Sequence, residues 1–176
     1  MKILYQGSPG AYSHLAAKEL YPDAEIISCK TFDECFVKAE QDKNSRIIIP
    51  ESNRITGNIG IEYLIFKHRL NIYAEHFYRV EHYLLGMRGT KLKDIKNVYS
   101  HAQALSQCSE FIKKNNINEN VRADTAGSAA LISNNKNKND AAIASKLSAE
   151  IYKLDVIASN IENEKGNVTR FLIMGK

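Results

Sequence analysis

The stretch from Leu70 to Met87, LNIYAEHFYRVEHYLLGM, is an unusually long run of residues that favour extended structure. Aromatic and β-branched residues recur along it, and such residues are enriched in strands. The run is longer than an ordinary strand. This length predicts a segment that passes from one lobe of the protein to another.

Strand patterns alternate with helix patterns on both sides of this stretch. The expected strands lie at 2–6, 25–29, 45–50, 97–100, 120–123, 140–145, 155–159 and 168–174. The expected helices lie at 11–21, 31–41, 60–68, 101–115, 124–134 and 146–154. Thr31, followed three residues later by Glu34, is a capping-box pattern. The alternation predicts an α/β architecture with largely parallel sheets.

The two ends of the chain fit one two-lobed domain spanning residues 1–176. If the chain leaves the first lobe within residues 72–85, the last strand can return to it. The segment NVTRF, residues 167–171, then lies at a second crossing beside the cleft between the lobes. We expect a first lobe of about residues 1–75 plus 166–176 and a second lobe of about residues 76–165.

Composition excludes several classes of function. The chain has 176 residues, a net charge of +4 and 25% charged residues, without a basic stripe that would indicate nucleic-acid binding. It has no apolar run near the roughly 18 residues of a membrane span and no signal peptide, so we expect a cytoplasmic protein. The three cysteines and five histidines show no metal-ligand spacing, and we expect reduced, buried thiols and no metal.

Four junctions place polar residues where a strand gives way to a helix. They contain the turn 7–10, the loop 52–56, Ser100, and Asp124 with Thr125. Such residues cap helices, and the amide groups at a helix start also bind carboxylates or phosphates. The sequence leaves both interpretations open. The glycine turn matches neither GxGxxG nor the P-loop, so nucleotide binding is unsupported.

Five motifs in this order give the chain a family resemblance: YQGSPGAYSHLAA, PESNRITG, YSHAQALSQC, ADTAGSAA and NVTRFL. The sequence resembles prephenate dehydratases along nearly its whole length. The resemblance implies a two-lobed, type-2 periplasmic-binding-protein-like α/β fold with the active site in the cleft. It also implies conversion of prephenate to phenylpyruvate, water and carbon dioxide without a cofactor. The chain ends at Lys176, so we expect a catalytic domain without the ACT regulatory domain that family members usually carry.

One motif departs from the family pattern PIENSxxG. The segment Pro50–Gly57 keeps the proline-to-glycine spacing, and Asn53 falls on the family's asparagine. Ser52 stands at the family's glutamate position and Arg54 at its serine position. These replacements put the polar lining of the cleft, and the choice of substrate, in question.

The resemblance assigns the candidate site residues. Thr169 is the expected catalytic residue, donating a hydrogen bond or relaying a proton to the departing hydroxyl group. Arg170 is a candidate for pairing with a substrate carboxylate, although neighbours on a regular strand point to opposite faces. Either the strand bends there or one of the two is structural. The remaining expected substrate-binding residues are Asn53, Ser100, Gln107 and Thr125.

Two alternatives to a prephenate dehydratase stay open at this point. One is an arogenate dehydratase, whose substrate carries an amino group where prephenate has a keto group. The other is a non-catalytic protein of the same fold that binds a small carboxylate. The expected partner is the small-molecule substrate rather than a nucleic acid or a membrane. A homodimer or higher homo-oligomer is an open expectation.

Overall fold

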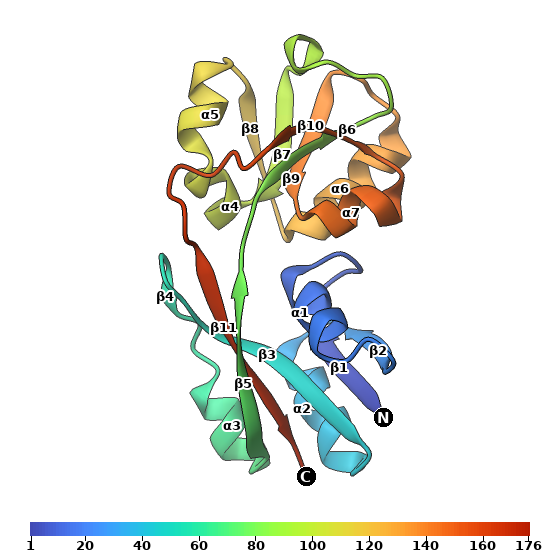
Figure 1. The fold of residues 1–176 in the computed structure, drawn as a ribbon, viewed down its shortest axis with the longest axis vertical. Helices are drawn as coiled ribbons and strands as arrows, with labels where there is room; N and C mark the ends of the chain where they lie inside the picture. The colour runs from blue at the N-terminus through green and yellow to red at the C-terminus, as the bar shows by residue number, and fades with distance from the viewer. The chain divides into compact units, whose positions relative to one another are not determined.

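The computed structural model describes all residues from Met1 to Lys176, and they form two compact units. The first unit contains Met1–Ser8, Tyr12–Val80 and Asn167–Lys176, and the second contains Pro9–Ala11 and Glu81–Gly166. Both termini belong to the first unit, as the labelled ends of the ribbon show (Figure 1). The long segment of the first unit ends at Val80, where the sequence had suggested a boundary after residue 75.

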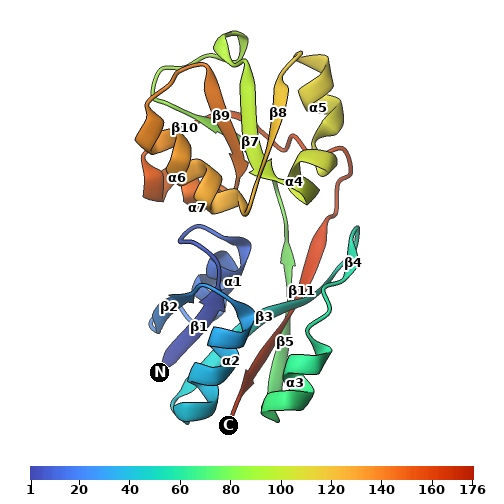
Figure 2. The same cartoon turned by 180° about the vertical axis from the view of Figure 1, so that it is seen from behind.

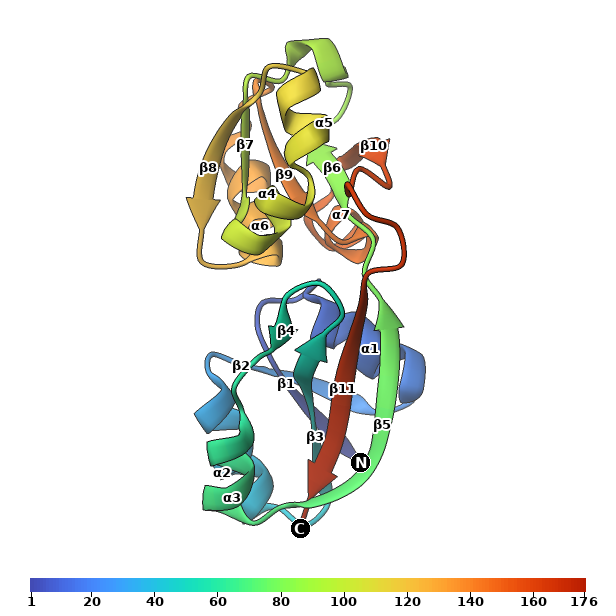
Figure 3. The same ribbon diagram turned by 90° about the vertical axis from the view of Figure 1, so that its left-hand side faces the viewer.

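The first unit is built on a sheet with the strand order β2-β1-β3-β11-β5, and the two-residue strand β4 pairs with β3. Its strands are β1 (Lys2–Gln6), β2 (Glu25–Cys29), β3 (Ser45–Asn53), β4 (Gly57–Asn58), β5 (Asn71–Arg79) and β11 (Val168–Gly175). Its helices are α1 (Tyr12–Leu20), α2 (Phe32–Gln41) and α3 (Glu62–His68). The residues Leu4, Ile47 and Ile49 pack with α2 and α3 in one core cluster. Because side chains alternate along a strand, Ile3 and Ile48 face the other side, which α1 covers (Figure 3).

The second unit is built on a five-stranded sheet with the order β10-β6-β9-β7-β8. Its strands are β6 (Tyr83–Gly86), β7 (Asn97–His101), β8 (Asn118–Arg122), β9 (Asp140–Ala144) and β10 (Asp155–Ser159). Its helices are α4 (Ala102–Gln107), α5 (Ser109–Lys114), α6 (Thr125–Asn135), α7 (Lys146–Tyr152) and the 3₁₀ helix Leu92–Asp94. One core cluster lies under α4 and α5 and a second under α6 and α7, so helices cover both faces of the sheet (Figure 2). The central strand β9 is buried at every residue.

The α/β class is confirmed, but the expectation of largely parallel sheets is wrong. Each sheet is mixed. In the first, β1 runs parallel to β2 and β3, whereas β11 runs antiparallel to both β3 and β5. In the second, β7 runs parallel to β8 and β9, whereas β6 runs antiparallel to β9 and β10. A parallel neighbour needs a crossover connection, usually a helix, and the last strand instead returns to its sheet from the other unit.

Local patterns predicted most of the helices and strands. The Thr31 hydroxyl accepts from the Glu34 amide at 3.1 Å, as the capping box predicts, although the Glu34 carboxylate accepts from the Lys30 amide rather than from Thr31. Most other boundaries differ from the expectation by one or two residues, and two differences are larger. The helix expected at 101–115 is interrupted at Cys108, and β3 continues through Pro50 to Asn53. All three cysteines are free and buried, as expected.

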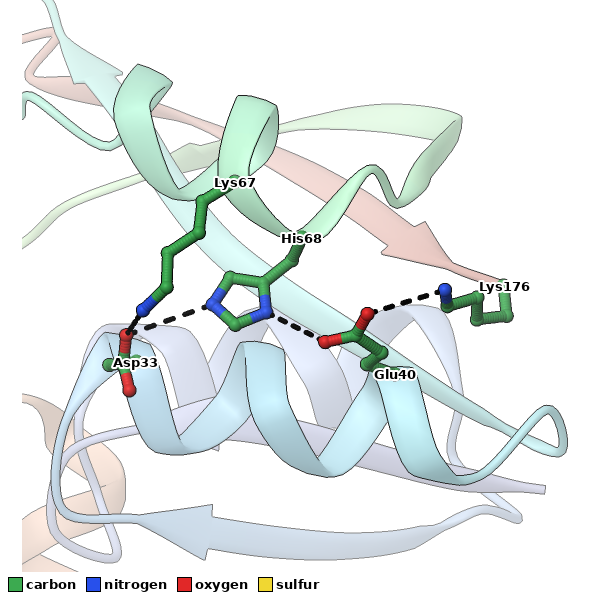
Figure 4. Close-up of polar contacts among 5 residues, drawn as sticks. All are labelled: Asp33, Glu40, Lys67, His68 and Lys176. Atoms are coloured by element: carbon green, nitrogen blue, oxygen red, sulfur yellow. Dashed lines mark hydrogen bonds and ion pairs between the residues drawn. The ribbon is translucent and has the colours of Figure 1, made fainter.

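A buried histidine joins α2, α3 and the C-terminus of the chain (Figure 4). His68 is 5% exposed, and its Nδ1 donates to Oε2 of Glu40 at 3.0 Å. Its Nε2 lies 3.7 Å from Oδ1 of Asp33, which also pairs with Lys67 at 2.8 Å. Lys176 lies 3.4 Å from the other oxygen of Glu40. The cluster thus surrounds two carboxylates with positively charged or hydrogen-donating groups.

This cluster predicts how stability responds to acid. The hydrogen bond from His68 lowers the pKa of Glu40, and the hydrogen bond from Lys67 lowers the pKa of Asp33. A carboxyl group with a lowered folded-state pKa stabilises the protein fully above its unfolded pKa, about 4, and loses that contribution as the pH falls through the folded value. We expect urea unfolding to show declining stability below about pH 4.5, with a shallower decline for Glu40→Gln than for the unaltered protein. An identical acid profile for the two proteins would contradict this role of Glu40.

Candidate active site

The hydroxyl group of Thr169 lies in a hydrogen-bonded network at the start of β11. Thr169 is 7% exposed and pairs with Asn53 in the strand register. Nδ2 of Asn53 donates to Oγ1 of Thr169 at 2.9 Å and to Oδ1 of Asn167 at 2.7 Å. Asn167 is 1% exposed. Three polar side chains from two neighbouring segments are therefore held together in the first unit.

The orientation of the Asn53 amide is fixed by backbone groups. Its Oδ1 accepts from the amides of Ile55 and Thr56, at 2.9 and 3.1 Å. A backbone N–H can only donate, so the oxygen must face this turn and the NH₂ group must face Thr169. The threonine oxygen therefore accepts a hydrogen bond from Asn53, and its own hydrogen is directed elsewhere. The arrangement presents the Thr169 hydroxyl as a donor.

The hydrogen bonds of Asn53 all go to other groups of the protein. The family resemblance predicted Asn53 as a substrate-binding residue. In the structure the Asn53 amide bonds with Thr169, Asn167 and the turn that follows it. This is the geometry of a positioning residue. Asn167 was not predicted as a site residue, although it belongs to the same NVTRF motif. Its position two residues before Thr169 was the available signal, because residues two apart on an extended segment share a face.

Arg170 lies on the opposite face of β11 from Thr169, as the alternation of a strand requires. Its Nε donates to Oε2 of Glu75 at 2.7 Å, and its NH1 group lies 3.3 Å from Oε2 of Glu51. The hydrogen bond to Glu75 raises the pKa of the guanidinium. Two carboxylates of the protein already offset its charge. This environment favours the structural alternative that the sequence had left open for Arg170.

The altered motif at residues 50–57 contains an irregularity in the sheet. Ser52 pairs with Arg170 and Pro50 with Phe171, so Glu51 is an extra residue on β3. Such a bulge re-aims side chains. The Ser52 hydroxyl donates to Oε2 of Glu51 at 2.6 Å, and the same oxygen faces Arg170. A carboxylate is therefore present beside Ser52, one position before the family's glutamate.

Ser100 in the second unit is fully buried at the end of β7. Its hydroxyl donates to the carbonyl oxygen of Ile143 on β9 at 2.7 Å. The residue that caps α4 is the next one, His101, whose Nδ1 accepts from the Gln103 amide. Ser100 thus lies one position before the helix start at which the sequence placed it, and its side chain joins two strands.

Gln107 is paired with a buried histidine. Its Oε1 lies 2.7 Å from Nε2 of His82, which is 2% exposed, and Glu162 accepts from the His82 amide at 3.0 Å. Burial lowers the pKa of His82. An amide oxygen can only accept, so Nε2 of His82 is the donor to the glutamine oxygen. In the sequence, His82 was only one of five histidines without metal-ligand spacing. The two residues are far apart in the chain, and no local pattern connects them.

Thr125 is the first residue of α6 and is half-buried. The cap itself is Asp124, whose Oδ1 accepts from the Gly127 amide at 2.6 Å. The capping alternative therefore holds for Asp124. Its negative charge stabilises the helix start and disfavours a second carboxylate beside it.

No group of three or more histidine, cysteine, aspartate or glutamate side chains is arranged to hold a metal ion. None of the helices combines the length and the apolar character needed to cross a membrane.

Comparison with known proteins supports the family resemblance that the five motifs suggested. The family model of prephenate dehydratase matches residues 3–176. This chain belongs to the prephenate dehydratase family. Arogenate dehydratase 2 of Petunia hybrida is 38% identical over 177 residues, which are 100% of this chain and 45% of that protein. Arogenate dehydratase/prephenate dehydratase 1, chloroplastic, of Arabidopsis thaliana is 40% identical, with the same coverage. The chain spans less than half the length of these curated relatives.

Solved structures of related proteins have the same fold. A protein described as a novel type of quorum-quenching acylase, GqqA, superposes with a TM-score of 0.93 at 33% identity, over 100% of this chain and 64% of that one. The prephenate dehydratase of Staphylococcus aureus subsp. aureus Mu50 gives a TM-score of 0.86 at 28% identity, over 99% and 66%. A methionine-bound nutrient binding protein of Burkholderia cenocepacia, at 8% identity and a TM-score of 0.51, over 99% of this chain and 84% of that one, shares the fold alone. The expected fold class is confirmed by the match to the solved prephenate dehydratase structure.

Proposed function

We propose that this chain is a dehydratase that converts prephenate to phenylpyruvate, water and carbon dioxide, with Thr169 as its catalytic residue. Membership of the prephenate dehydratase family supports the reaction class. The observation that carries the residue assignment is the hydrogen bond from Asn53 to the threonine oxygen, which leaves the hydroxyl hydrogen to donate. The other residues of the sequence-based site, Ser100, Gln107, Thr125 and Arg170, stay predictions.

The chemistry requires few groups because aromatisation of the ring drives the reaction. The electron pair of the bond to the ring carboxylate moves into the ring as carbon dioxide leaves, and the bond to the ring hydroxyl breaks. The departing oxygen must gain a proton to leave as water. A threonine hydroxyl is a very weak acid, so Thr169 acts as a positioned donor or relays a proton. Positioned donors of this kind contribute about 10² to 10⁴ in rate.

A second substrate is favoured by the comparisons. Arogenate has the same ring, ring carboxylate and hydroxyl as prephenate, and the same steps would convert it to phenylalanine. Several curated relatives with 37–40% identity are named as arogenate dehydratases. Because this chain covers less than half of those proteins, their activities come to it only as candidates.

The test is to assay the purified protein with each substrate in the presence of a chelator. We expect phenylpyruvate from prephenate, and the ratio of kcat/KM for the two substrates ranks them. Turnover of arogenate alone would replace the proposed substrate. Binding of prephenate without turnover would favour the non-catalytic carboxylate-binding alternative. A strict requirement for added metal would contradict catalysis by the protein's own side chains.

The altered motif makes a further prediction about the loop that contains Asn53. Relative to the family pattern, Ser52 and Arg54 make these two positions two charges more positive. We expect Ser52→Glu combined with Arg54→Ser to change kcat/KM for prephenate at least about tenfold, or about 1.4 kcal/mol of transition-state binding. Arg54→Lys, which keeps the charge, is the control. An unchanged kcat/KM in the double variant would place these side chains outside the substrate's reach.

A further inference from the structure

A buried histidine of the second unit is connected to one of the predicted site residues. His82 lies just before β6 and is 2% exposed. Its main chain is held by the segment that follows β10. The His82 amide donates to Oε2 of Glu162 at 3.0 Å, and the His82 carbonyl oxygen accepts from the Ile161 amide at 3.2 Å. The backbone that carries the imidazole ring is therefore held at both its amide and its carbonyl group.

The same segment holds the main chain of Gln107, the last residue of α4. The Asn163 amide donates to the Gln107 carbonyl oxygen at 2.7 Å. The Asn163 side chain donates to the carbonyl oxygen of Ser106 at 3.3 Å and accepts from the Glu110 amide at 3.1 Å. The segment passes beside the end of α4 (Figure 2). Because residues 161–163 bind both backbones, they set where the side chains of the histidine and the glutamine meet.

The hydrogen bond between these side chains determines how the Gln107 amide is turned. Nε2 of His82 donates to Oε1 of Gln107 at 2.7 Å. The amide oxygen therefore faces the buried ring, and the NH₂ group lies at the other end of the amide. Gln107 itself is only half-buried. An amide nitrogen can only donate and an amide oxygen can only accept, so the end of Gln107 that is directed away from His82 is a donor.

We propose that His82 is a positioning residue for substrate choice: by holding the Gln107 oxygen, it directs the Gln107 NH₂ group toward the side chain of the substrate and favours a keto acid over the corresponding amino acid. The inference rests on the proposed function, which includes Gln107 among the predicted substrate-binding residues. The keto oxygen of prephenate only accepts hydrogen bonds, whereas the ammonium group at the same position of arogenate only donates. A fixed donor therefore fits prephenate and gives the ammonium group of arogenate no acceptor.

The two substrates are otherwise the same, which makes the ratio of their activities a specific measurement. Groups that bind the carboxylates or the ring hydroxyl affect both substrates alike. A purely structural role of His82, joining α4 to the chain before β6, would also lower both activities together. The ratio of kcat/KM for prephenate to that for arogenate is independent of the fraction of folded enzyme, because that factor cancels. Neutral substitutions that do not affect the contact with the keto or amino group therefore leave the ratio unchanged.

His82→Phe is the first test. Phenylalanine keeps a planar ring and removes the N–H, so the Gln107 amide can turn either end toward the substrate. We expect the prephenate-to-arogenate ratio of kcat/KM to fall about tenfold. Gln107→Met, which is similar in length and has neither a strong donor nor a strong acceptor at its end, should lower the ratio as well. His68→Phe is the matched control, because His68 is also buried but is bonded to Glu40 in the first unit, and it should leave the ratio unchanged.

The double variant tests whether His82 acts through Gln107. We expect His82→Phe to change the ratio by less than about threefold when it is added to Gln107→Met. A ratio that stays unchanged in His82→Phe, or that falls by the same factor with and without Gln107, would overturn the proposal. So would an unaltered protein that prefers arogenate.

Failure of the proposed function gives a different result. In that case the unaltered protein turns over neither substrate, and calorimetry then measures the two dissociation constants. The same variants should reduce the preference for binding prephenate over arogenate by about tenfold. Equal affinity of the unaltered protein for the two compounds, or binding of neither, would overturn the inference.

Discussion

Thr169→Val is expected to lower kcat for the dehydration by about 10² or more. Valine is β-branched and similar in volume to threonine, so the start of β11 keeps its shape. What disappears is the hydroxyl that Asn53 orients as a donor. Substrate affinity should stay within about threefold, because the group acts mainly in the transition state. Steady-state kinetics with prephenate and with arogenate measure both quantities.

Stability provides the first control for this variant. Valine leaves one N–H of the part-buried Asn53 amide without its acceptor, at a cost of about 1 kcal/mol. For a protein of this size, that cost lowers Tm by about 2–4 °C. Thr169→Ser retains the hydroxyl and should keep most of the activity. A valine variant that turns over at near the unaltered rate would show that Thr169 is only a structural part of the strand.

Asn53→Asp is expected to lower kcat by about 10² while Thr169 stays in place. Aspartate keeps the oxygen that accepts from the Ile55 and Thr56 amides, so the turn is preserved. An ionised carboxylate only accepts hydrogen bonds. The Thr169 hydroxyl would therefore turn inward to donate to residue 53 and would no longer donate to the substrate. The added negative charge should also raise KM for an anionic substrate.

Combining the two changes separates this explanation from a general disturbance of the loop. If Asn53 acts through the threonine hydroxyl, the double variant Asn53→Asp with Thr169→Val should have a kcat within about threefold of either single variant. Independent effects would multiply to about 10⁴. Ile55→Asp is the matched control, because it adds the same charge to the same turn without touching Thr169. Multiplicative effects, or an equal loss with Ile55→Asp, would contradict the positioning role of Asn53.

Local patterns predicted the secondary structure well because their causes are local. The β1 and β2 segments, the Thr31 cap and the start of α6 all depend on residues within a few positions of one another. The predicted elements were wrong where pairing with a segment distant in the chain determines the structure. β3 continues through Pro50 because β11, from the far end of the chain, pairs with it there. The mixed character of the sheets has the same cause.

In the candidate site, too, the sequence identified residues, whereas their contacts depend on segments distant in the chain. Motif order pointed to Thr169 and Asn53, which the strand register brings together although 116 residues separate them. The sequence could not assign their hydrogen-bonding roles. The pairing of Gln107 with His82 and of Ser100 with Ile143 also joins residues that no local pattern relates. A side-chain hydroxyl or amide group can bind a ligand, position another side chain or join two strands. Which of these it does depends on the groups that surround it in the folded protein.

By itself, the sequence determined the family, the α/β class and the positions of the motifs, because strand and helix periodicity and motif spacing are properties of the chain in one dimension. Only the tertiary structure decided which way the side chains point and what they contact. It placed Arg170 between two carboxylates, on the face of β11 away from Thr169. It also left β5 with an open edge. Both results follow from which strands become neighbours, and that depends on contacts between residues far apart in the sequence.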